Sequence, residues 1–271
     1  MKLKEDYDTL KANVKSFIKT NSDLIDTQNY AEIYYKLSDE FFYNRDGIGI
    51  FTGILLKADI NPLERMRNMP DSFLLSNKII SYIDIPDNIT TLGSKAFFNS
   101  GIKKLVLPPK ITIIPDSFCT STYDLKTVDF SKCTGLGLIE PFAFSTCAIE
   151  TLDITNTKVA LIEHHAFERC HCLTHANLAE PNLRIINNGA FEYCTSLRKV
   201  EFTNGLLQIG QNAFAGCANL TEVRLPESIS TIQMNAFSHC NLKKLYIPKR
   251  FENTDMLYGC GITDKTEVIF Y

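Results

Sequence analysis

Hydrophobic positions recur along most of this chain with a period of about two dozen residues. A phenylalanine follows a small residue eight times, at intervals of 24, 21, 26, 23, 24, 23 and 23 residues: Phe73, Phe97, Phe118, Phe144, Phe167, Phe191, Phe214 and Phe237. Such a period is typical of a solenoid, in which each coil buries its apolar face against its neighbours. We therefore expect residues 66–271 to form a solenoid of about eight coils.

Each repeat also contains a short alternation of apolar and polar residues, as in Leu197-x-x-Val200-x-Phe202. Period-two alternation predicts a short strand with one buried face. A second apolar pair, such as Leu206 and Ile209, precedes the next phenylalanine. The pattern predicts a parallel β-sheet on the concave face, with loops and short helical turns elsewhere.

A small side chain recurs three residues after each phenylalanine. It is serine in the first three coils and cysteine in the next five: Ser76, Ser100, Ser121, Cys147, Cys170, Cys194, Cys217 and Cys240. A residue needed in every coil is better explained by packing in a tight turn than by catalysis. Cys119, Cys133 and Cys172 lie outside this column, and the sequence pairs none of them with a base that would activate a thiol.

The two ends depart from the repeat. Residues 1–65 contain an amphipathic spacing, from Leu3 to Phe17, that predicts a helical N-terminal cap or domain over the first coil. At the other end, Leu257-x-x-Cys260 keeps the repeat register with leucine in place of phenylalanine. The segment 267–271 (EVIFY) predicts a final strand that serves as a C-terminal cap.

The repeat L-x-x-L-x-L-P … I-x-x-I-x-x-x-A-F-x-x-C resembles the BspA-type leucine-rich repeats over roughly residues 66–260. The resemblance implies a leucine-rich repeat solenoid. It also points to the bacterial and protist surface adhesins among the family's members. The junction LLKADINPLERMRNMPDSF, residues 55–73, looks like proteins of tailed bacteriophages, so we also expect a phage-encoded protein.

Composition narrows the possible partners. The net charge of −3 and the isoelectric point near 6.0 give no electrostatic basis for binding nucleic acid. The N-terminus shows no secretory signal, and the longest apolar stretch, residues 48–56, is too short to cross a bilayer. We therefore expect a cytoplasmic protein (in the host cytoplasm if phage-encoded) without membrane contact, whose nine cysteines are reduced.

One segment, HHAFERCHCLTH, gathers residue types that bind metals. It contains His164, His165, His171 and His175 beside Cys170 and Cys172. His175 should point outward from a strand, whereas His164 and His165 should lie in the turn before the phenylalanine, so these side chains diverge. We therefore expect no metal, no cofactor and no enzymatic activity. A metal-binding or enzymatic role for this cluster is the least favoured alternative.

The outward strand positions form the predicted binding surface, because repeat arrays usually bind on their concave face. The selected residues are Tyr82, Lys104, Lys126, Asp129, Glu150, Asp153, His175, Arg198, Glu201, Glu222, Arg224, Lys244 and Tyr246. Their mixed charges and two tyrosines suit a protein partner better than a phosphate backbone.

We therefore predict a binding scaffold that recognises another protein through this face or the helical cap. In the phage interpretation, it would inhibit a host factor or a defence system by occlusion. The alternative is a structural or adhesive protein of a virion or a cell surface. The sequence does not specify the oligomeric state.

Overall fold

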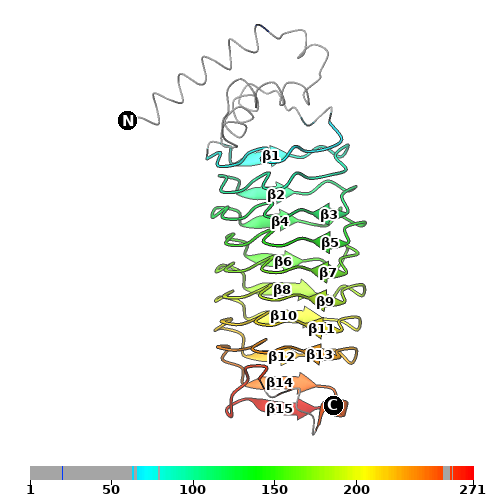
Figure 1. The fold of residues 1–271 in the computed structure, drawn as a ribbon, viewed down its shortest axis with the longest axis vertical. Helices are drawn as coiled ribbons and strands as arrows, with labels where there is room; N and C mark the ends of the chain where they lie inside the picture. The colour runs from blue at the N-terminus through cyan, green and yellow to red at the C-terminus, as the bar shows by residue number, and fades with distance from the viewer. Residues whose placement is uncertain (1–19, 21–62, 64–65, 79, 253–256, 258) are drawn as a thin grey trace, which may run out of the picture.

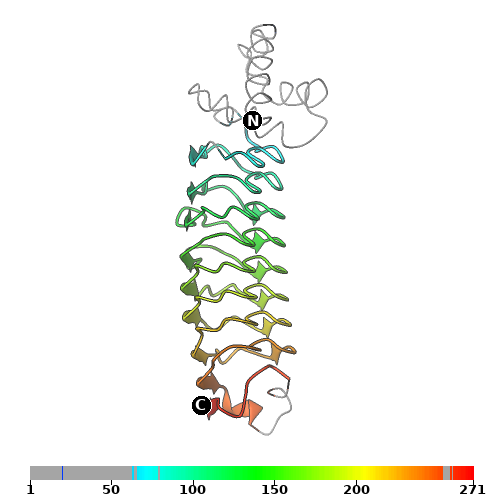
Figure 2. The same ribbon diagram turned by 90° about the vertical axis from the view of Figure 1, so that its left-hand side faces the viewer.

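The computed structural model describes residues 20, 63, 66–78, 80–252, 257 and 259–271. Within them, the chain winds through eight coils that stack along a nearly straight axis in both side views (Figures 1 and 2). We number the coils one to eight after the phenylalanines from Phe73 to Phe237. The predicted solenoid is therefore confirmed. The helical cap predicted for residues 1–65 lies outside the described residues, apart from Thr20 and Leu63.

One side of the stack consists of the predicted parallel strands, and we call it the strand face. The inward residues of these strands are buried while their neighbours face solvent, which confirms the prediction from alternation. The strands are β1 (Tyr82–Asp84), β2 (Lys104–Val106), β4 (Thr127–Asp129), β6 (Thr151–Asp153), β8 (His175–Leu178), β10 (Lys199–Phe202), β12 (Glu222–Arg224), β14 (Lys244–Ile247) and β15 (Glu267–Phe270).

A second, narrower parallel sheet forms a different side of the stack. Each of its two-residue strands ends at the second residue of the apolar pair that precedes a phenylalanine, such as Ile209 of Leu206 and Ile209. The sequence analysis recognised these pairs without predicting a strand. They are β3 (Ile113–Ile114), β5 (Leu138–Ile139), β7 (Leu161–Ile162), β9 (Ile185–Ile186), β11 (Gln208–Ile209) and β13 (Thr231–Ile232), and they pair in that order.

The third side consists of tight turns around the phenylalanines, which we call the Phe turns. Each contains two residues with left-handed backbone four positions apart, such as His165 (φ 55°) and Arg169 (φ 56°) in coil five. This conformation aims alternate N–H groups at the next coil. The Phe167 N–H donates to the Ala190 carbonyl at 2.8 Å, and the Arg169 N–H donates to the Glu192 carbonyl at 2.7 Å. Backbone hydrogen bonds thus join the coils on this side as well.

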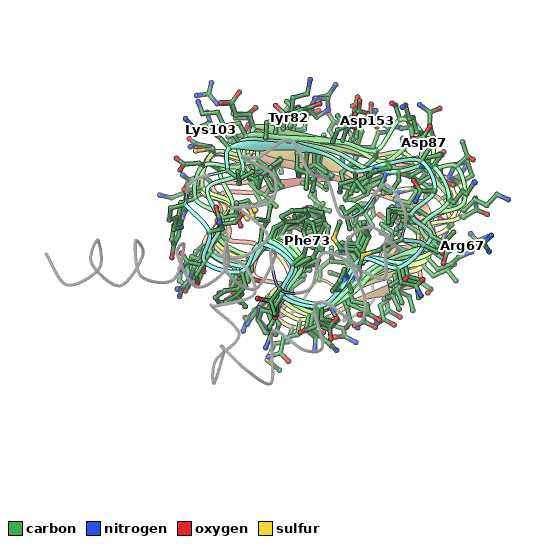
Figure 3. The ribbon with its side chains drawn as sticks, turned by 90° about the horizontal axis from the view of Figure 1, so that it is seen from above. Arg67, Phe73, Tyr82, Asp87, Lys103 and Asp153 are labelled. Carbon is green, nitrogen blue, oxygen red and sulfur yellow. The ribbon has the colours of Figure 1, made fainter. Side chains whose placement is uncertain are left out.

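The phenylalanines form a continuous column at the centre of the stack. All eight are buried, and Figure 3 shows Phe73 well inside the ring of backbone. The rings of Phe167 and Phe191 stack at 5.2 Å with an interplanar angle of 4°, and those of Phe191 and Phe214 stack at 5.2 Å with 2°. Because each ring covers the next, burial is completed by neighbouring coils.

The predicted alignment is wrong by one residue in coil three. The Cys119 N–H donates to the Ala143 carbonyl at 2.7 Å, as the Phe144 N–H does to the Ala166 carbonyl at 2.8 Å. Cys119 therefore holds the backbone position that phenylalanine holds in later coils, and Phe118 lies one position earlier. The shift turns the Phe118 ring, which meets Phe144 edge-on at 89°.

Coil one carries the same shift, since Leu74 rather than Phe73 donates its N–H to Ala96 at 2.6 Å. The small-residue column is therefore displaced in both coils. It contains Asn77 in coil one and Thr122 in coil three, in place of the predicted Ser76 and Ser121. All eight phenylalanines still lie in the core, because a ring placed one position earlier still fills it.

The small-residue column donates hydrogen bonds. The thiols of Cys170 and Cys194 donate to the carbonyls of Phe144 and Phe167 in the preceding coil, at 3.2 and 3.1 Å. The Thr122 hydroxyl makes the same bond to the Phe97 carbonyl at 2.6 Å. The position thus favours a small donor, which is a stricter requirement than the small size that the sequence indicated.

The C-terminal end is only partly as predicted. β15 is the expected final strand and pairs with β14. However, the Phe237 N–H donates to the Cys260 carbonyl at 2.8 Å, the bond that Phe214 makes to Ala236. Cys260 therefore occupies the small-residue position before a phenylalanine, so the register predicted from Leu257 is wrong. Within the described residues, no helix has the length and apolar character needed to cross a membrane.

Candidate functional site

All thirteen predicted site residues lie on the strand face. Ten are within its strands, and Lys126, Glu150 and Arg198 directly precede β4, β6 and β10. Figure 3, which looks down the stack, shows Tyr82, Lys103 and Asp153 projecting from this side. Among the large side chains of the strand face, Tyr82 in β1 is strongly exposed, with 56% of its surface accessible to solvent.

The strand register brings some of these residues into contact. Lys126 Nζ lies 3.2 Å from Glu150 Oε1, and His175 Nε2 lies 2.7 Å from Glu201 Oε2. Lys199 Nζ lies 2.5 Å from the other oxygen of Glu201. The Lys199 and His175 hydrogen bonds hold the pKa of Glu201 below its ordinary value. Glu201 is therefore a fixed negative charge between two donors.

The strand face is interrupted at two places. Its ladder consists of three separate groups, β1-β2-β4, β6-β8-β10 and β12-β14-β15. A depression of about 330 Å³ lies between β4 and β6, and one of about 610 Å³ lies beside β10 and β12. Each of these two depressions therefore lies at a break in the ladder.

The depression between β4 and β6 is lined by Lys104, Asp129 and Asp153. Hydrogen bonds from Ser131 lower the pKa of Asp129. Burial acts to raise the pKa of Asp153, but hydrogen bonds from the Thr155 N–H and hydroxyl outweigh it, so the pKa of Asp153 is also lowered. Both carboxylates are therefore charged at neutral pH and suited to a basic group.

The depression beside β10 and β12 combines charge with aromatic surface. It is lined by Arg198, Lys199, Glu201, Glu222 and Arg224. The Arg224 guanidinium lies 5.1 Å from the centre of the Tyr246 ring and 4.4 Å from that of Tyr271. The Tyr271 hydroxyl donates to the Leu225 carbonyl, which fixes its ring beside Arg224.

Tyr271 was not among the predicted site residues. Its signal in the sequence was the alternation from Glu267 onward, which continues the strand pattern to the last residue. Lys199, which directly follows the predicted Arg198, was also not among the predicted site residues. Both contribute to the depression's chemistry through their contacts with Arg224 and Glu201.

The histidines diverge as predicted. His175 belongs to β8 on the strand face, whereas His164 and His165 lie in the Phe turn of coil five. His171 Nδ1 lies 3.3 Å from the Thr195 hydroxyl. The structure therefore does not bring the four histidines of this segment together, as their expected directions implied. It does place His165 beside Glu168 and Glu192.

Two of the thiols outside the small-residue column are held in their protonated, unreactive form. Cys119 and Cys133 are buried, and burial raises the pKa of both, that of Cys133 to about 12. Cys172 is exposed.

The fold was compared with solved structures. A leucine-rich cell surface protein from Faecalibacterium prausnitzii aligns at 17% identity over 76% of this chain and 76% of its own, with a TM-score of 0.37. A leucine-rich repeat protein from Bacteroides ovatus aligns at 19% identity over 75% and 77%, with a TM-score of 0.34. The pneumococcal vaccine antigen PcpA aligns at 19% identity over 76% and 56%, with a TM-score of 0.40.

The curated proteins gave no significant match. In contrast, the family model described as the BspA type leucine-rich repeat region matches residues 47–137 and 137–260, which is more than half of the sequence. The matched residues include all eight buried phenylalanines, from Phe73 to Phe237. The chain therefore belongs to the BspA-type leucine-rich repeat family.

Proposed function

We propose that this protein binds another protein through the strand face, with the depression beside β10 and β12 at the centre of the contact. The observation that carries this proposal is the packing of Arg224 against Tyr246 and Tyr271 at the edge of that depression. Arginine and tyrosine are among the residue types most enriched at the energetically dominant positions of protein interfaces.

The family supports the same class of function. Leucine-rich repeat scaffolds are typically protein-binding or surface-adhesion proteins, and they are typically non-enzymatic. Their stacked coils present a long rigid surface whose outward positions can vary without disturbing the core. The contacts of Lys199 and His175 with Glu201 add pre-organised polar groups to such a surface.

The charge distribution favours a partner that carries both signs. The depression between β4 and β6 offers Asp129 and Asp153, which suit lysine or arginine side chains. The depression beside β10 and β12 offers Arg198 and Arg224, which suit carboxylates. A nucleic acid would meet repulsion at the first of these, since its phosphates are uniformly negative. A folded protein surface can match both.

The first experiment is affinity purification of the full chain from the cells that produce it, followed by measurement of the partner's Kd. Arg224→Ala should weaken binding at least tenfold, because it removes the cation between the two tyrosines. Lys158→Ala, an exposed cation next to the narrow sheet, is the matched control and should leave the Kd unchanged. Equal effects of the two substitutions, or no stoichiometric partner, would refute the proposal.

A narrower form of the proposal concerns a phage setting. In that setting, the partner would be a host factor or a defence protein. It would be inhibited because the strand face covers its functional surface. Adding the purified protein to the partner's activity assay should then inhibit it, and Arg224→Ala should not. Recovery of the protein in purified virions or on a cell surface would instead support the structural or adhesive alternative.

A further inference from the structure

Three metal-ligating side chains meet where the Phe turns of coils five and six touch. His165 Nδ1 lies 3.4 Å from Glu168 Oε2 and 3.8 Å from Glu192 Oε2, and the three ligand atoms lie within 4.8 Å of one another. His165 and Glu168 come from one turn, and Glu192 comes from the next coil. The carboxylates are only 18% and 16% exposed, so this cluster is largely withdrawn from water.

The His165 imidazole presents an unsatisfied atom to the carboxylates. Nδ1 is shut off from solvent and makes no hydrogen bond, although two carboxylate oxygens lie close to it. A buried nitrogen without a partner costs free energy, and so do two carboxylates held together. The cluster therefore lacks positive charge at its centre.

The imidazole is held in this orientation by packing. The Phe142 ring stacks on it at 5.2 Å with an interplanar angle of 9°. On the next coil lies Gly189, where an ideal Cβ would come within 2.5 Å of His165 Nδ1 and 3.1 Å of Glu192 Oε2. The absence of a side chain at Gly189 thus leaves space beside both ligand atoms.

Glu168 is oriented by a second contact. Arg169 Nε lies 3.3 Å from its Oε1, which leaves Oε2 toward His165. The Arg169 guanidinium also lies 5.7 Å from the centre of the Tyr193 ring, so it is held at the edge of the cluster. Arg169 therefore balances part of the negative charge of Glu168 from outside the cluster. Groups of this kind orient the ligands of metal sites.

We propose that His165, Glu168 and Glu192 bind a divalent transition-metal ion of the Zn²⁺ class, which links coil five to coil six. Two ligands at about 2.0–2.2 Å from a tetrahedral zinc ion are separated by roughly 3.3–3.6 Å. The Nδ1–Oε2 separations of 3.4 and 3.8 Å are close to that range. One imidazole with two carboxylates is a donor set suited to zinc, with the remaining position open to water.

This site differs from the cluster considered in the sequence. It uses one of the four clustered histidines and none of the cysteines, and two of its ligands are glutamates. Glu168 and Glu192 are 24 residues apart, which is one repeat, so stacking brings them together. The expected consequence of binding is a staple in the middle of the stack, because a ligand that binds only the folded state stabilises it.

The test is calorimetric titration of the full chain with Zn²⁺, in a Cys172→Ser background that removes the exposed thiol. We expect the background protein to bind one equivalent of Zn²⁺. Glu192→Gln should weaken the affinity for that ion more than tenfold. His165→Asn should do the same, since asparagine tolerates the left-handed backbone at this position. The matched control is Glu201→Gln, which alters the His175–Glu201 pair on the strand face. It should leave the affinity for Zn²⁺ unchanged.

Thermal unfolding provides a second readout. Zn²⁺ should raise the Tm of the background protein and leave that of the Glu192→Gln variant unchanged. Failure of Zn²⁺ to bind, or equal binding by the Glu192→Gln and Glu201→Gln variants, would overturn the proposal. An NMR titration showing that His165 stays protonated and unaffected by Zn²⁺ would also overturn it, because a proton would then hold the carboxylates together.

Discussion

Phe130 and Phe202 occupy the same position in their coils, two residues after the buried centre of a strand (Val128 in β4 and Val200 in β10), and the strand-face ladder is interrupted directly after each. Each ring packs edge-on against the phenylalanine of the next coil, Phe130 on Phe144 at 6.0 Å and Phe202 on Phe214 at 6.1 Å. Where this position holds isoleucine or leucine, the next strand pairs normally: Ile85, Leu107, Ile154, Leu178, Leu225 and Ile247. We attribute the two depressions to the larger rings, which need more room between coils.

Replacing Phe202 with leucine should close the break between β10 and β12. The smaller side chain resembles Leu178 and Leu225, whose coils pair normally, so amide hydrogens around Thr221 and Glu222 should exchange more slowly. Loss of the contact with Phe214 should cost about 1–2 kcal/mol of unfolding free energy. Hydrogen exchange and urea unfolding measure the two effects. In the proposed function, the partner's affinity should fall because the depression shrinks.

The reciprocal substitution, Leu225→Phe, is the matched control. It places a ring at the equivalent position of a paired coil and should open the ladder between β12 and β14, with faster amide exchange there. Overpacking of this kind typically costs about 1–3 kcal/mol. Unchanged exchange in both variants would show that ring size does not cause the breaks.

The small-residue column should discriminate between donors and non-donors. Cys194→Ser retains a donor for the Phe167 carbonyl, as the Thr122 hydroxyl provides for Phe97. Cys194→Ala removes it, although the Phe167 carbonyl keeps the Cys170 N–H at 3.3 Å. We therefore expect alanine to be less stable than serine by about 1 kcal/mol. Urea unfolding midpoints of the two variants, measured side by side, test this. Equal midpoints would show that the small-residue column requires only a small side chain and not a hydrogen-bond donor.

Because many of its thiols are buried, we predict that the protein's free energy of unfolding falls at alkaline pH. Burial raises the pKa of Cys119, Cys147, Cys194 and Cys217 well above the ordinary value, and that of Cys133 to about 12. In the unfolded chain these thiols ionise near pH 9, whereas in the folded chain they keep their protons. Stability should therefore fall as pH rises above about 9, by up to about 1.4 kcal/mol per pH unit for each thiol.

Urea unfolding at pH 8 and pH 10 under reducing conditions measures this loss. Cys194→Ser is the control, since a serine hydroxyl does not ionise in this range and the variant should lose less stability. A midpoint independent of pH would mean that these thiols are more hydrated than the structure shows.

The sequence predicted the repeat because a coil cannot close a core alone, so the same apolar positions must recur in each one. The shift at Phe118 was also written in the sequence but was missed: Phe118 follows Ile114 by four residues, whereas Phe144 follows Ile139 by five. The intervals on either side of Phe118, 21 and 26 residues, depart furthest from the common period for the same reason. The backbone hydrogen bond from Cys119 to Ala143 identifies the shift. The second sheet was missed because its strands are only two residues long, too short to show alternation.

The candidate site was predictable to the extent that it follows from alternation. Outward positions such as Asp153 and Arg224 are fixed by the buried residues beside them. The depressions depend on how two coils pack, which no single repeat encodes, although Phe130 and Phe202 stand out in an otherwise aliphatic column. Contacts one period apart, such as Glu168 with Glu192, could have been found by writing the repeats beneath one another.

Gly216 should not tolerate a side chain. Its φ of 74° is left-handed, and an ideal Cβ would lie 2.5 Å from the Tyr193 ring of the preceding coil. Equivalent positions hold Arg169 and His239, so the backbone contributes only about 1 kcal/mol and the clash supplies the rest. We expect Gly216→Ala to cost about 2–3 kcal/mol of unfolding free energy, measured with urea. In a Tyr193→Ala background the same substitution should cost only about 1 kcal/mol, because the ring is gone. Equal costs in both backgrounds would assign the whole effect to the backbone.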